Sequence, residues 1–146
     1  MNDRVRSFLA IELPVEVKDY LARLIKRLQN QGFTDLRWLE PRSIHLTLKF
    51  LGEIKPQLIE TIIHKLRDCS FGTSNLNLVT DKLGVFPNLR RPRIGYKTSL
   101  KQLSLISGYD LSVKPISMTV DNVILMKNVF TSYHFKYKRI ANFQIC

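Results

Sequence analysis

Two periods of hydrophobic and polar residues run along the chain and predict helices and strands. Apolar residues recur every three or four positions over 15–31 and again after Pro56, which is the spacing of a helix with one buried face. Pro14 and Pro56 stand where proline is well tolerated, at the start of a helix. We therefore predict a helix in each stretch.

Short apolar or alternating runs, bounded by Gly, Pro, Asn or Ser, predict the strands. They cover 6–13, 36–39, 43–51, 76–85, 93–97, 118–126 and 133–145, with a basic loop over 88–92 and a short helix over 100–106. The second half thus has less helix than the first. The expected class is α+β, with antiparallel sheets flanked by helices.

Length and composition predict one domain over residues 1–146, because 146 residues with 45% hydrophobic content suit a single core. No signal-peptide pattern or membrane-spanning run is found, and Cys69 and Cys146 indicate neither a disulfide framework nor a zinc site. These features predict a cytoplasmic protein that has no membrane partner.

The charge narrows the choice of partner. The net charge is +11, and from residue 82 onward the acidic residues are only Asp110 and Asp121. The basic residues of that region are Lys82, Arg90, Arg91, Arg93, Lys97, Lys101, Lys114, Lys127, Lys136, Lys138 and Arg139. A polyanion, nucleic acid above all, is the expected partner, and a charged surface that only keeps the protein soluble is the alternative.

The strand over 43–51 carries the candidate chemistry. Strict alternation puts His45, Thr47 and Lys49 on one face and the apolar side chains between them on the other. Residues two apart lie about 6.6 Å apart, so an imidazole and a hydroxyl so placed can reach one phosphate. His45 would move a proton, Thr47 would donate to a non-bridging oxygen, and Lys49 would favour the anion. An ordinary half-buried strand histidine is the alternative.

The sequence around this motif resembles the two-histidine (2H) phosphoesterase superfamily, most closely its branch of RNA 2′,3′-cyclic phosphodiesterases, also called 2′-5′ RNA ligases. The resemblance rests on RSFLAIELP at 6–14, LRWLEP at 36–41, HLTLKFLGE at 45–53, FP at 86–87, RPRI at 91–94, VDNVILM at 120–126 and YKRIANF at 137–143.

The resemblance implies a bilobal fold whose two halves each supply one H-x-T strand to an RNA-binding cleft. It implies a reaction that needs no metal or other cofactor. One histidine acts as base and the other as acid, and a 2′,3′-cyclic phosphate is opened to a 2′-phosphate. The reverse direction gives 2′-5′ ligation.

The second H-x-T motif of this family is not found. The interval between Tyr96 and Met118 contains no histidine, and Ser117-Met118-Thr119 is better aligned with the strand that follows. We therefore expect an incomplete second lobe, reduced activity and possible self-association through that lobe. Natural loss, an internal deletion and a longer parent protein are all compatible with the gap. His134, in the predicted last strand, is a weak candidate for the second histidine.

Further residues have two interpretations each. Phe8 either stacks on a base or packs in the core, and Arg91 and Arg93, with Arg90, either hold the RNA backbone or lie on a solvated loop. The predicted partner is RNA with a 2′,3′-cyclic phosphate or a 2′-5′ linkage. A catalytically degenerate RNA-binding module is the alternative function, and a hydrolase of small cyclic phosphates is a third.

Overall fold

The structure is a computed structural model that describes residues 3–33, 38–69, 75–83, 112–130 and 135–145. The chain divides into two compact units. The first unit comprises 1–14, 42–78 and 118–146, and the second comprises 15–41 and 79–117. The single domain over 1–146, the pseudo-symmetry of two lobes and the incompleteness of the second lobe stay predictions.

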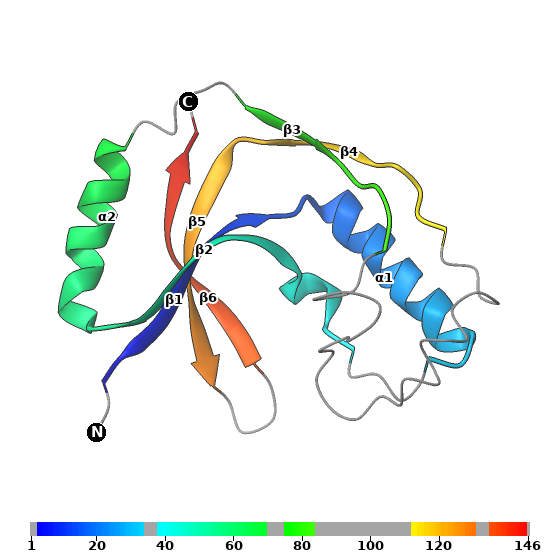
Figure 1. The fold of residues 1–146 in the computed structure, drawn as a ribbon, viewed down its shortest axis with the longest axis horizontal. Helices are drawn as coiled ribbons and strands as arrows, with labels where there is room; N and C mark the ends of the chain where they lie inside the picture. Colours follow the sequence, from blue (N-terminus) through cyan, green and yellow to red (C-terminus); the bar gives the residue numbers. More distant parts are fainter. Residues whose placement is uncertain (1–2, 34–37, 70–74, 84–111, 131–134, 146) are drawn as a thin grey trace, which may run out of the picture. The chain divides into compact units, whose positions relative to one another are not determined.

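The first unit contains a four-stranded sheet with the strand order β2-β1-β5-β6, and every neighbouring pair is antiparallel (Figure 1). The strands are β1 (Val5–Glu12), β2 (His45–Ile54), β5 (Asn122–Phe130) and β6 (Phe135–Gln144). The prediction of antiparallel sheets flanked by helices is confirmed.

One face of this sheet is covered by α2 (Ile59–Asp68), which follows a short 3-10 turn, η2 (Pro56–Leu58). Ile63 of the helix packs with Leu125 and Phe143 of the sheet in a buried cluster. The helical stripe predicted after Pro56 is therefore the stripe that seals this face.

The opposite face has a separate cluster. Phe8 and Ala10 from β1 pack with Ile124 and Met126 from β5, and the half-buried Tyr137 of β6 lies against them. The strand register explains why these residues meet, because Phe8 pairs with Met126 and Ala10 pairs with Ile124. His45 stacks on Phe8, so we call the side of the sheet that carries this cluster the His45 face.

The second unit is built around α1 (Val15–Asn30), close to the predicted helix over 15–31. Its stripe is buried at Val17, Leu24 and Leu28. The chain leaves the helix at Gly32, whose φ of 104° is one that glycine adopts without strain. The Tyr20 hydroxyl accepts a hydrogen bond from the Lys114 backbone N–H at 2.6 Å, which ties the later segment to the helix.

The second sheet consists of β3 (Leu76–Val79) and β4 (Ser117–Val120). The strand predicted over 76–85 ends at Val79, so the prediction is wrong for residues 80–83, and 84–85 lie outside the described residues. At the next residue, the Thr80 hydroxyl donates to the Lys114 carbonyl at 2.9 Å and accepts from the Ile116 N–H at 2.8 Å. The Thr80 backbone N–H also donates to the Ile116 carbonyl at 3.0 Å, so backbone pairing with the 112–116 segment reaches Thr80 and its side chain binds two further backbone groups there.

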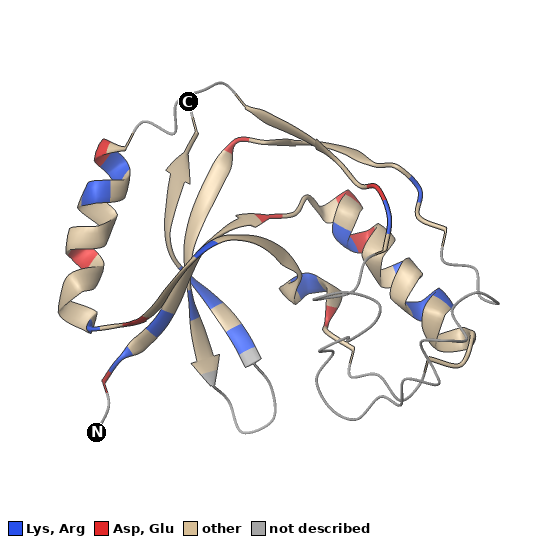
Figure 2. Ribbon diagram, viewed as in Figure 1, with Lys and Arg blue, Asp and Glu red and all other residues tan. Residues whose placement is uncertain are grey.

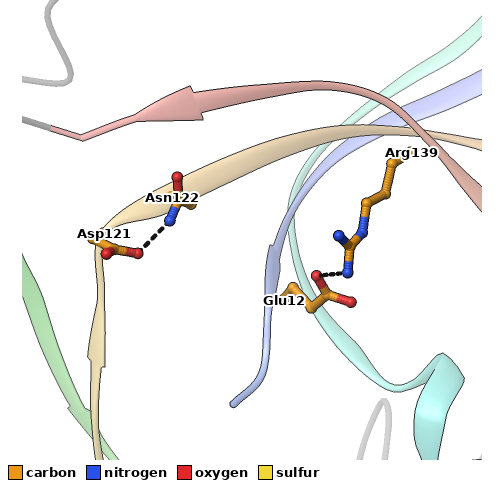
Figure 3. Close-up of polar contacts among 4 residues, drawn as sticks. All are labelled: Glu12, Asp121, Asn122 and Arg139. Atoms are coloured by element: carbon orange, nitrogen blue, oxygen red, sulfur yellow. Dashed lines mark hydrogen bonds and ion pairs between the residues drawn. The ribbon is translucent and has the colours of Figure 1, made fainter. Parts of the chain in front are cut away.

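A single strand over 118–126 is also wrong, because the segment is divided between two sheets at Asp121. β4 pairs with β3 before this residue and β5 pairs with β1 after it. The Asp121 carbonyl accepts the Ile145 N–H at 2.8 Å, and its carboxylate accepts the Asn122 side-chain amide (Figure 3). The strand predicted over 93–97, the loop over 88–92 and the helix over 100–106 lie outside the described residues.

Candidate active site

His45 is the first residue of β2. One residue separates it from the 3-10 turn η1 (Pro41–Ser43). This turn brings the Ser43 carbonyl to 2.9 Å from Nδ1 of the imidazole. Because a carbonyl oxygen only accepts, Nδ1 carries the hydrogen of this bond. The remaining nitrogen, Nε2, is therefore the atom that can take up or release a proton.

Two aromatic rings fix the plane of the imidazole. Phe8 of β1 stacks on it with ring centres 4.9 Å apart, and Tyr137 of β6 meets it edge-on at 4.7 Å. Phe8 and Tyr137 also contact each other at 5.3 Å. Such geometries are favoured by the charge distribution of aromatic rings, so the histidine has one well-defined orientation.

The structure gives no support to base stacking by Phe8, and that role stays a prediction. Its side chain is only 2% exposed because it lies in the core of the His45 face, under the imidazole. The alternative, core packing, is the one that the structure supports, and it adds a direct contact with His45.

Thr47 lies on the same face as His45. His45 pairs with Glu12 and Thr47 pairs with Ala10, and these β1 partners are two residues apart. His45 is half-buried and Thr47 is exposed, so this face is not closed over by the described part of the chain. The roles assigned to both residues stay predictions.

Lys49 does not lie on the same face of the sheet as His45 and Thr47. Two irregularities in the β1–β2 register leave Leu48 and Leu51 without a β1 partner, and after the first of them Lys49 pairs with Leu9. Leu9 belongs to the cluster under α2, on the opposite face. Phe50 pairs with Phe8 instead, and its ring lies 6.2 Å from the Phe8 ring.

The strict alternation predicted for this strand is therefore wrong beyond Thr47. The physical reason is the bulge, which inserts one extra residue and exchanges the two faces. The register gives Lys49 no support as a phosphate-binding residue of the His45 face.

The His45 face carries a charged pair that the sequence did not reveal. Arg139 of β6 donates to the Glu12 carboxylate (Figure 3). Glu12 is the direct partner of His45 in the ladder. Basic residues also occur along β6 and on α2 (Figure 2). Arg90, Arg91, Arg93 and His134 lie outside the described residues.

Two findings concern ligands and membranes. Within 3–33, 38–69, 75–83, 112–130 and 135–145, no group of three or more His, Cys, Asp or Glu side chains could hold a metal ion. In the same ranges, none of the helices is both long and apolar enough to cross a membrane.

The family model for LigT like Phosphoesterase matches residues 11–96, more than half of the chain. The chain belongs to this family, within the 2H superfamily. The match contains His45 and Thr47 and ends before the interval in which the second H-x-T motif was expected.

Curated relatives agree with this assignment. The chain is 31% identical over 91 residues to the RNA 2′,3′-cyclic phosphodiesterase of Methanothermobacter thermautotrophicus. It is 32% identical over 90 residues to that of Thermotoga maritima. Each match covers 62% of this chain and 49% or 48% of the relative. The chain spans about half the length of the curated relatives it matches.

Solved structures show the same fold. The crystal structure of E. coli LigT with 3′-AMP matches with a TM-score of 0.71 at 18% identity and covers 98% of both chains. A Thermus thermophilus protein matches with a TM-score of 0.70 at 19% identity, over 96% of this chain and 97% of that one.

Proposed function

We propose that this chain processes RNA ends by hydrolysing a 2′,3′-cyclic phosphate to a 2′-phosphate, and that the same site can form a 2′-5′ linkage when an RNA 5′-hydroxyl takes the place of water as the nucleophile. The observation that carries the proposal is the pairing of an oriented imidazole with an exposed hydroxyl on one face of β2. Family membership and the names of the relatives support the same chemistry.

In the forward direction water attacks the phosphorus atom and the bond to the 3′-oxygen breaks. His45 uses Nε2 either to accept the proton of the attacking water or to protonate the leaving 3′-oxygen, and solvent or a second group supplies the other transfer. Thr47 donates a hydrogen bond to a non-bridging oxygen, where negative charge increases in the transition state. The products are a 2′-phosphate and a free 3′-hydroxyl.

The test is hydrolysis of a nucleoside 2′,3′-cyclic phosphate by the purified chain in the presence of a chelator, with the product identified by phosphorus NMR. We expect the 2′-phosphate to form. Thr47→Ala should lower kcat/KM by about 10- to 100-fold, the value of a hydrogen bond to a charged group, and Thr47→Ser should keep most of the rate.

Thr61→Ala, which removes an exposed hydroxyl from α2, is the matched control and should leave the rate unchanged. A wild-type chain that makes no product, or makes only a 3′-phosphate, would contradict the proposal.

A degenerate RNA-binding module is the second candidate, because the chain lacks a second H-x-T motif and carries a net charge of +11. Both candidates bind RNA in a salt-dependent way, so turnover separates them and binding does not. The cytoplasmic location indicated by the cysteine content belongs to the same proposal.

Self-association remains part of the proposal. In the described part of the chain, the second sheet has two strands, and β3 exposes the large apolar side chains of Leu76 and Val79. We expect light scattering at working concentration to give a mass above the 17.0 kDa of one chain. Val79→Lys should shift the mass toward 17.0 kDa, since a lysine on an edge strand opposes pairing. A wild-type monomer would exclude this proposal.

A further inference from the structure

Two side chains of β6 reach across the sheet to one residue pair of the β1–β2 ladder. Tyr137 meets the His45 ring, and Arg139, two residues further along the strand, donates to Glu12. Glu12 and His45 are direct partners in the register. Their Cβ atoms are therefore about 5 Å apart, which brings the guanidinium held by Glu12 to within about 10 Å of the imidazole.

The exposure of this pair is unequal. The Arg139 side chain is 64% exposed, whereas that of Glu12 is 28% exposed. A guanidinium has five N–H donors, and the contact with Glu12 is made through one of its nitrogens. The other donors remain available for a planar anion, and the fork of an arginine fits the oxygens of a phosphate. An exposed ion pair of this kind contributes little to the stability of the fold.

The geometry points to Arg139 as a substrate-binding residue of the His45 site, whose guanidinium binds the non-bridging oxygens of the phosphate. It supplies the positive charge that the sequence suggested for Lys49, which the bulge in β2 turns to the other face. The identity of the ligand as a cyclic phosphate, or as its 2′-phosphate product, rests on the proposed function. The position of the Arg139 guanidinium near His45 does not depend on the proposed function.

The experiment measures binding of adenosine 2′-monophosphate by isothermal titration calorimetry, which needs no turnover. Arg139→Gln should raise the dissociation constant by about 10- to 100-fold, because a charge-assisted hydrogen bond is lost. Arg139→Lys keeps the charge and loses the fork, so its loss should be smaller.

Lys138→Gln is the matched control. It removes the same charge one position away on β6, where Lys138 pairs with Lys127 and its side chain points to the opposite face. Its dissociation constant should stay within about twofold of the wild type, because screening weakens the effect of a distant exposed charge. Circular dichroism checks that each variant is folded. If Arg139→Gln does not fold, Arg139→Lys decides by the same comparison.

Equal losses in Arg139→Gln and Lys138→Gln would overturn the inference, since net charge would then explain both. Failure of the wild type to bind the nucleotide would overturn it too. An Arg139-dependent binder without hydrolysis supports the inference and removes the proposed function. An enzyme that hydrolyses the cyclic phosphate with an unaffected Arg139→Gln keeps the function and removes the inference.

Discussion

Replacing His45 with alanine is expected to lower kcat/KM for a 2′,3′-cyclic phosphate by about 10²- to 10⁴-fold, the usual contribution of a positioned proton-transfer group. The imidazole has Nδ1 occupied by the Ser43 carbonyl and Nε2 left for the reaction. His45 is half-buried and is not a member of either core cluster described above, so the loss should appear in activity far more than in folding. Steady-state hydrolysis in the presence of chelator measures it.

His64 provides the matched control for this change. It is exposed on α2, which covers the opposite face of the sheet, so His64→Ala should hydrolyse at the wild-type rate. His45→Asn adds a second comparison, since it keeps a polar group near Ser43 but no side-chain nitrogen that can accept a proton. Activity in His45→Asn equal to the wild type would show that proton transfer does not occur at this position.

Phe8→Ala is expected to lower the free energy of unfolding by about 3 to 5 kcal/mol, the usual cost of removing a buried aromatic ring. Phe8 is 2% exposed and packs with Ala10, Ile124 and Met126. It also supports the His45 ring, so the variant loses both a core side chain and the surface on which the imidazole rests. Urea denaturation followed by circular dichroism measures the change.

Two further variants separate the effect of burying a side chain from the effect of its aromatic ring. The first changes Phe50. It contacts the Phe8 ring but is 69% exposed, and Phe50→Ala should change stability by no more than about 0.5 kcal/mol. Phe8→Leu keeps an apolar side chain in the core and removes the stacked ring. We expect a stability loss below about 1.5 kcal/mol together with a fall in kcat/KM. If Phe8→Leu is as active as the wild type, the ring is not needed to orient His45.

Local periodicity predicted the elements that depend on one segment only. The helices after Pro14 and Pro56 were found because an apolar stripe is written in a single stretch of sequence. The strand that begins near His45 was found for the same reason. The common face of His45 and Thr47 follows from the spacing of two residues within a regular stretch.

The errors all involve partners elsewhere in the chain. The bulge at Leu48 is defined by the pairing of β2 with β1, which lies elsewhere in the sequence. The break at Asp121 exists because β4 and β5 belong to different sheets. Arg139 and Glu12 are 127 residues apart in sequence, and no local pattern announces their contact. Phe8 was left with two interpretations because an aromatic residue in an apolar strand is compatible with both. Its burial in the structure favours core packing.

The acceptor that orients His45 belongs to the main chain at Ser43, and this has a bearing on how the site tolerates change. No side-chain replacement at position 43 deletes a peptide oxygen, and a peptide group does not ionise as the medium becomes more acidic. The tautomer of the imidazole is thus encoded by the shape of a short turn that starts at Pro41. Neighbouring residues can vary during evolution while the reactive nitrogen stays the same, provided that the turn itself survives.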